Sequence, residues 1–253
     1  FLDINFMIPV TIIIHTLSEE INLPYALENV TNWASQVCVV DSESNDKTCE
    51  IAQKYKADLY SRASDRKGLV NQRNWALDNI NFKNEWVFIL DADAQLKNDT
   101  LQRVLTFAQN GSWAAVQLRK SVLNTSKNFL TNCQGIEMAM DAYFQLGRLY
   151  STGVSELRGN GQLVRKDILL RCGSFNENTV TDDLDLSVRL LLSQSKIGIF
   201  WDPPVMEEAV EDVYALFRQR QRWAEGGLQR FFDYGKNLIH SKLAFIQKFD
   251  LLY

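Results

Sequence analysis

Two aspartates separated by one residue follow an apolar run in the first half of the chain. Asp91 and Asp93 come directly after residues 86–90, whose side chains are all apolar. At the end of a buried strand, carboxylates at this spacing can share one divalent cation, and Mg²⁺ or Mn²⁺ favours such oxygen ligands and commonly bridges to phosphate. Without a cation, the two carboxylates would repel and raise each other's pKa. The competing interpretation is an acidic turn between a strand and a loop.

A second group of acids lies in the run Thr-Asp-Asp-Leu-Asp at residues 181–185, just before an amphipathic helical pattern. Thr181 or Asp182 could cap that helix, and acids favour a helix N-terminus. Capping explains one or two of the three acids. It leaves a carboxylate that could serve as a general base.

Asp41 ends another apolar run, residues 37–40, and precedes a loop of turn-forming residues at 42–46. A carboxylate at a strand end can accept hydrogen bonds from a nucleobase or a ribose, and the free N–H groups of the following helix favour an anion. The alternative is an aspartate that only opens a loop or caps a turn. Arg73 lies in a polar stretch before a helical pattern, where its guanidinium could reach a phosphate.

An amide, a guanidinium and an indole share one face of a predicted helix near the end of the chain. Gln219, Arg222 and Trp223 stand at positions i, i+3 and i+4, which are neighbours on a helix surface. Together they suit a polyanionic leaving group beside a sugar ring, because arginine makes bidentate phosphate contacts and tryptophan offers a flat apolar surface. The alternative is a tryptophan packed into the core beside extended arginines.

Three weaker features complete the set. The run Gly-Asn-Gly at 159–161 would permit a tight turn or a close backbone approach. His15 is expected to be a structural histidine with its hydrogen bonds satisfied. The acids of residues 207–212 are expected to form a solvated face.

These residues need elements to position them, and the apolar pattern predicts strands that alternate with helices. The predicted strands of the first half are residues 10–14, 37–40 and 86–90. The predicted helices there are residues 20–33, 47–56 and 100–109. The less regular second half predicts helices at 129–149, 185–193 and 214–232 and strands at 163–164 and 197–200. This alternation predicts an α/β fold with a parallel sheet covered on both faces, and such sheets bind ligands beyond the carboxyl ends of their strands.

The composition of the chain argues against several classes of function. The chain has 253 residues, of which 46% are hydrophobic and 23% charged, as in a folded soluble domain. A net charge of −4 argues against a nucleic-acid partner, and two histidines are few for a zinc site or a histidine-based triad. No apolar run is long enough to cross a bilayer. Because the chain starts at Phe1, we expect it to be a segment of a longer protein.

The order of the motifs resembles that of the family 2 glycosyltransferases with a GT-A fold. The motifs are, in order, Asp41, the Asp-x-Asp pair, the acids at 181–183 and the Gln-x-x-Arg-Trp run. The set is similar in particular to the membrane-associated branch with cellulose, chitin and hyaluronan synthases and the cyanobacterial-type glucosyl-diacylglycerol synthases. The resemblance extends from about Val10 to about Phe232. Two motifs depart from the family pattern: Pro-Thr-x-Asn-Glu reads His-Thr-Leu-Ser-Glu at 15–19, and Thr-Glu-Asp reads Thr-Asp-Asp at 181–183.

The resemblance implies a GT-A catalytic domain over residues 1–232, with a Rossmann-like, mostly parallel sheet between helices. An amphipathic basic segment, 233–253, would then lead to membrane helices outside this sequence. The resemblance also implies a role for each motif residue. The nucleotide-binding residues would be Thr16, Glu19, Asp41, Arg73 and Asp91, with Asp41 facing a uracil. Asp91 and Asp93 would hold Mg²⁺ or Mn²⁺, and Asp183 would be the catalytic base. Asp182, Gln219, Arg222 and Trp223 would bind the donor and the acceptor.

The activity that the resemblance implies is transfer of a hexose, glucose, from a UDP-sugar to a hydroxyl of a membrane lipid such as diacylglycerol. One base and no protein nucleophile imply inversion, so that the product is a β-glycoside. The enzyme would be membrane-associated, with its active site on the cytoplasmic side. Three alternatives remain: a processive β-polysaccharide synthase with a glycan acceptor, a non-catalytic sugar-nucleotide-binding module, and a phosphatase of the haloacid dehalogenase type.

Overall fold

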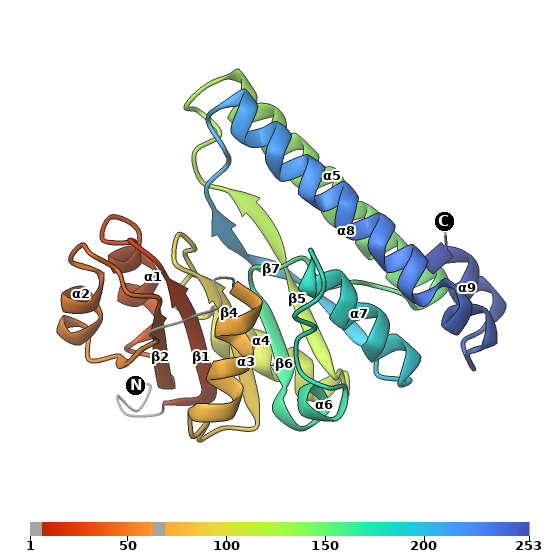
Figure 1. Cartoon of the computed structure of the whole chain (residues 1–253), viewed down its shortest axis with the longest axis horizontal. Coiled ribbons are helices and arrows are strands. Elements are labelled where there is room, and N and C mark those ends of the chain that lie inside the picture. Colours follow the sequence, from red (N-terminus) through yellow and green to blue (C-terminus); the bar gives the residue numbers. More distant parts are fainter. Residues whose placement is uncertain (1–6, 63–68, 253) are drawn as a thin grey trace.

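Seven strands form one sheet in a computed structural model that describes residues 7–62 and 69–252 (Figure 1). The strands are β1 (Ile8–Thr16), β2 (Ala34–Asp41), β3 (Asp58–Ser61), β4 (Trp86–Asp91), β5 (Ala115–Val122), β6 (Gln162–Arg165) and β7 (Ile197–Glu207). Their order in the sheet is β3-β2-β1-β4-β6-β5-β7, and only the pairings of β6 with β4 and β5 are antiparallel. The mostly parallel α/β sheet predicted from the apolar runs is confirmed.

Helices cover both faces of this sheet. They are α1 (Leu23–Val30), α2 (Thr48–Lys54), α3 (Leu69–Asn79), α4 (Thr100–Asn110), α5 (Phe129–Thr152), α6 (Lys166–Arg171), α7 (Asp182–Leu192), α8 (Val213–His240) and α9 (Phe245–Leu252). On β1, Ile12 and Ile14 pack with α1 and α4, while Ile13 between them packs with α3 on the opposite face. A strand buried on both faces needs apolar side chains at every position, which explains the continuous run at 10–14.

Two strands escape the sequence pattern. β3 is a four-residue edge strand whose side chains are half-buried or exposed. β5 interrupts its apolar residues with Gln117, Arg119 and Lys120. All three of these side chains line the large cavity described below. The sequence of β5 therefore lacks the pattern of a buried strand, because part of this strand lines the cavity.

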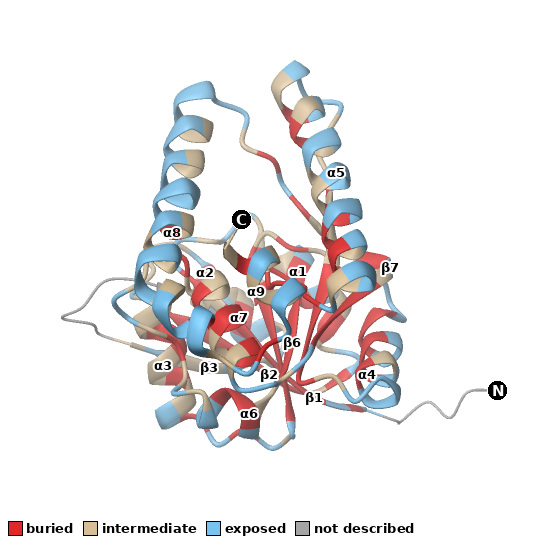
Figure 2. Ribbon diagram, turned by 90° about the vertical axis from the view of Figure 1, so that its right-hand side faces the viewer, coloured by how far each residue is buried: buried red, intermediate tan, exposed pale blue. Residues whose placement is uncertain are grey.

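The two longest helices, α5 and α8, extend away from the sheet on the same side of the molecule (Figure 2). The expected boundary between residues 232 and 233 falls inside α8, because this helix continues unbroken to His240. Beyond it, Leu243 and Leu251 are buried in the same apolar cluster as α7 residues. Arg148 of α5 also pairs with Asp250 of α9 at 2.7 Å. Residues 233–252 thus fold back onto the domain, and none of the described helices is long and apolar enough to cross a membrane.

The turn before β6 depends on a glycine. Gly161 has a φ of +73°, and a Cβ there would lie 2.6 Å from Cγ1 of Val205 on β7. Its N–H donates to the carbonyl of Ile89 at 3.1 Å, so the glycine extends the pairing between β4 and β6. The close backbone approach predicted for residues 159–161 is confirmed.

Gly161→Ala should therefore destabilise the fold more than Gly173→Ala. Gly173 has a similar φ of +85° but nothing within 4 Å of its missing Cβ. Both variants bear the left-handed backbone cost of about 1–2 kcal/mol, and Gly161→Ala adds overpacking of about 1–3 kcal/mol. Urea unfolding measures both free energies. Equal losses would contradict the close contact with Val205.

Candidate active site

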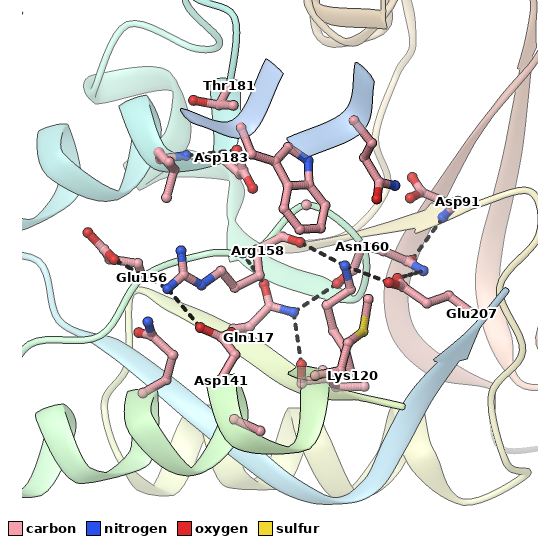
Figure 3. Close-up of a pocket in the computed structure, with 18 of the residues that line it drawn as sticks. Asp91, Gln117, Lys120, Asp141, Glu156, Arg158, Asn160, Thr181, Asp183 and Glu207 are labelled. Carbon is pink, nitrogen blue, oxygen red and sulfur yellow. Dashed lines mark hydrogen bonds and ion pairs between the residues drawn. The ribbon is translucent and has the colours of Figure 1, made fainter. Parts of the chain in front are cut away.

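A cavity of about 460 Å³ opens beyond the carboxyl end of β4 (Figure 3). It brings together motif residues from four separate parts of the chain. The predicted site residues that line it are Arg73, Asp91, Asp93, Asp182, Asp183, Gln219, Arg222 and Trp223. The structure thus assembles the Asp-x-Asp pair, the acids at the start of α7 and the α8 motif around one space.

Thr16, Glu19 and Asp41 form a second group, at the neighbouring ends of β1 and β2, and do not line this cavity. Thr16 donates its hydroxyl to Asp41 Oδ1 at 2.8 Å, and the fully buried Asp41 also accepts from the N–H of Ser44 at 2.9 Å. The backbone N–H of Glu19 donates to Thr48 Oγ1 at 2.8 Å. Asp41 therefore does organise the following turn, which was one of the two interpretations of its sequence.

The Asp-x-Asp pair is partly buried, and this burial raises the pKa of both carboxyls. Burial raises the pKa of Asp91, although Arg73 and Lys120 oppose the shift. Burial, together with the charges of Asp91 and Glu207, raises the pKa of Asp93 to about 7. A bound divalent cation would favour the ionised form of both carboxyls, and carboxylate oxygens are the ligands that Mg²⁺ and Mn²⁺ prefer. Among the described residues, no group of three or more histidine, cysteine or acidic side chains could hold a metal. A cation on this pair would therefore take further ligands from substrate or water.

The two acids that begin α7 differ in their surroundings. Asp182 is ion-paired with the guanidinium of Arg73, which is only 2% exposed. Asp183 accepts a hydrogen bond from the backbone N–H of Leu184 at 2.9 Å and has no ion pair among the described residues. Burial and the charge of Asp182 raise the pKa of Asp183 to about 6. Asp183 is thus a carboxylate that can take up a proton near neutral pH.

Helix α8 carries Gln219, Arg222 and Trp223 along the cavity, and a close contact fixes its position. A Cβ on Gly226 would lie 2.1 Å from Oγ1 of Thr181, so α8 touches the segment that precedes Asp183. Trp223 is 36% exposed. The alternative of a tryptophan packed in the core is therefore wrong.

A polar network that the sequence did not predict lies behind the Asp-x-Asp pair. Asn160 accepts from the N–H of Asp91 at 3.1 Å and donates to Glu207 at 3.1 Å, and Glu207 pairs with Lys120 at 2.8 Å (Figure 3). Glu207 is 8% exposed, so its assignment to a solvated face is wrong. Glu208, the next residue, is exposed as expected. The usable signals were the polar residues of β5 and the glycines that flank Asn160.

The expectation for His15 is also wrong. Both ring nitrogens are buried and have no hydrogen-bond partner within the described part of the chain. Burial, followed by the charges of Arg73 and Arg62, lowers the pKa of His15 well below its ordinary value. The imidazole is therefore neutral at the end of β1, where His15 is in register with Asp91 of β4.

Asp93→Asn should raise the melting temperature of the metal-free protein at about pH 8. The pKa of Asp93 is about 7 in the folded state against an ordinary value of 3.8. Between these values the unfolded chain ionises more readily, so folding stability falls as the pH rises, and the amide escapes this loss. Asp78→Asn, at an exposed carboxylate of α3, is the control. The gain should vanish below about pH 4, and a lower melting temperature at pH 8 would contradict the argument.

Solved structures with different sequences share this fold. The chain superposes on the mannosyltransferase PcManGT from Pyrobaculum calidifontis, solved with GDP-Man and Mn²⁺, with a TM-score of 0.73 at 19% identity, covering 98% of this chain and 69% of that one. For S. aureus TarS 1–349 with UDP-GlcNAc, the TM-score is 0.66 at 15% identity, with coverage of 96% and 70%. The expected GT-A fold is confirmed.

A curated relative extends the similarity to the sequence. The chain is 40% identical over 220 residues to the beta-monoglucosyldiacylglycerol synthase of Synechocystis sp., covering 85% of this chain and 46% of the relative. The chain spans about half the length of the curated relatives that it matches. Residues 86–252, which include the Asp-x-Asp pair, the acids of α7 and the α8 motif, match the model of glycosyl transferase family group 2. The chain therefore belongs to glycosyl transferase family group 2.

Proposed function

We propose that this domain is an inverting glycosyltransferase that moves glucose from UDP-glucose to the free hydroxyl of diacylglycerol. The observation that carries the proposal is the convergence of Asp91, Asp93, Asp183 and the α8 motif on one cavity. The name of the Synechocystis relative, a beta-monoglucosyldiacylglycerol synthase, supports glucose as the sugar and diacylglycerol as the acceptor.

Asp183 is the proposed base. Its pKa of about 6 lets it ionise at neutral pH and still accept a proton from the acceptor hydroxyl. Arg73 forms its ion pair with Asp182 and not with Asp183, so the base keeps a carboxylate oxygen for the acceptor. The acceptor oxygen attacks the anomeric carbon while the bond to the diphosphate breaks. A single displacement inverts the carbon, and an α-linked donor yields a β-glycoside.

The leaving diphosphate needs positive charge as it departs. Arg222 and Gln219 on α8 can donate hydrogen bonds to its oxygens from the cavity wall. Asp91 and Asp93 would hold Mg²⁺ or Mn²⁺, and the Mn²⁺ in the PcManGT complex supports this type of cation. When bound, the cation stabilises the negative charge that develops on the diphosphate.

The nucleoside would lie over the ends of β1 and β2. Thr16, Glu19 and Asp41 gather there, beside the strand that carries Asp91. Thr16 and Ser44 hold the buried carboxylate of Asp41, so contact with a uracil would require the turn at Ser44 to open. The UDP-GlcNAc in the TarS complex supports a uridine donor.

The acceptor is a lipid, so the domain must work at a membrane surface, which we propose is cytoplasmic. Among residues 233–252, the large apolar side chains of Ile239 and Phe245 are exposed. Lys236 and Lys242 lie nearby in the same segment, and basic residues are drawn to anionic lipid headgroups. We propose that this segment faces the bilayer.

Asp183→Asn should lower glucose transfer by about 10²–10⁴-fold, the usual contribution of a general base. UDP affinity measured by calorimetry should stay within about twofold, because the amide keeps the shape of the site. The assay supplies radiolabelled UDP-glucose and vesicles of diacylglycerol with anionic lipid. Asp233→Asn, at an exposed carboxylate of α8 outside the cavity, is the control. The wild-type rate should rise with pH through about 6, as Asp183 ionises.

Retained turnover in Asp183→Asn would remove this residue from the base role. Label in a polymer fraction would instead favour a β-polysaccharide synthase. Label in neither the lipid nor the polymer fraction, with UDP-glucose still bound, would favour a non-catalytic binding module.

Asp91→Asn should abolish the part of UDP affinity that depends on Mn²⁺. In EDTA, the wild type should bind UDP as weakly as this variant does in Mn²⁺, because the carboxylate supplies both charge and a ligand oxygen. Calorimetry with and without Mn²⁺ measures the difference. Equal UDP affinity of the wild type in EDTA and in Mn²⁺ would contradict the metal role.

A further inference from the structure

An ion pair joins α5 to α8 at the wall of the cavity. Arg220 of α8 pairs with Glu137 of α5, and both residues line the cavity. These helices are far apart in the sequence, and they leave the sheet as separate elements (Figure 2). The side chain of Arg220 is only 27% exposed, so its guanidinium is more confined than that of a typical surface arginine.

The same guanidinium contacts two residues of the α8 motif. Its Nη1 donates to Oε1 of Gln219 at 2.9 Å. Its central carbon lies 4.1 Å from the ring centroid of Trp223, well within the range of a cation–π contact. Arg220 therefore holds the amide and the indole through one planar group, with Glu137 holding that group from the opposite helix.

Within residues 7–62 and 69–252, the other hydrogen bonds between the α8 region and the rest of the domain lie before and after this point. Before the helix, the carbonyl of Val210 accepts from Gln134 of α5 at 2.8 Å. After the motif, Gln229 accepts from the N–H of Val180 at 3.0 Å, and Tyr234 donates to Asp185 at 2.7 Å. Arg220 lies between these anchors, in the stretch that carries the motif.

We propose that Arg220, held by Glu137, is a positioning residue that sets Gln219 for the donor and Trp223 for the acceptor. The inference rests on the proposed function, since it concerns how the transferase site is arranged. The flat fork of arginine is essential, because a lysine would keep the charge for Glu137 without bridging the amide and covering the ring. An isolated surface ion pair would contribute little to stability, so the role should appear in binding and turnover.

The test compares Arg220→Lys, Glu137→Gln and the double variant with Arg218→Lys. Arg218 is exposed on the same helix and does not line the cavity. Arg220→Lys should weaken UDP binding about fivefold, the effect of roughly one lost hydrogen bond. It should also raise the KM for diacylglycerol more than it lowers kcat, because Trp223 loses its support. Its melting temperature should match that of the Arg218→Lys control.

The double variant shows whether Glu137 acts through Arg220. Glu137→Gln should change UDP affinity and KM in the same direction as Arg220→Lys but less, and the double variant should be no worse than Arg220→Lys alone. Effects that multiply, or an Arg220→Lys protein that binds UDP and acceptor like the control, would overturn the proposal. Absence of transfer in the wild type would refute the proposed function instead, while UDP affinity would still report on Gln219.

Discussion

Repulsion between carboxylates that share one cavity is the constraint on which the rest of this structure depends. Asp91, Asp182 and Glu207 belong to three different elements, and Asp93 follows β4 directly. The charges of Asp182 and Glu207 raise the pKa of Asp91, and those of Asp91 and Glu207 raise the pKa of Asp93. Such a group is tolerated only if cations or protons offset its charge. In this site, positive side chains offset the charge of some carboxylates and not of others. Arg73 pairs with Asp182 and Lys120 with Glu207, whereas Asp93 has no ion pair within the described residues.

The uneven balance separates structural acids from reactive ones. Glu207 is joined to Asn160 and Lys120 and supports the backbone of Asp91, so its charge is used inside the protein. Asp93 and Asp183 keep raised pKa values of about 7 and 6, which leaves them free to respond to a cation or a proton from outside. The cationic side chains of Arg73 and Lys120 therefore determine which carboxylates can take part in chemistry.

Sequence reasoning recovered the parts whose signals are local. The strands that end at Asp41 and Asp91 are continuous apolar runs, so both their existence and the position of the acids were readable. Strand β5 was missed because Gln117 and Lys120 break its pattern to serve the cavity. The pairing of Arg73 with Asp182 joins residues 109 positions apart, and no local pattern carries that information. Glu207 was misjudged because the acid that follows it is exposed.

Helix α8 is unbroken from Val213 to His240, and at a rise of about 1.5 Å per residue it is a rod of about 40 Å. It bears Gln219 and Trp223 near its start and Lys236 near its end. One continuous helix therefore carries both the cavity motif and the basic end, with about 25 Å between Gln219 and Lys236.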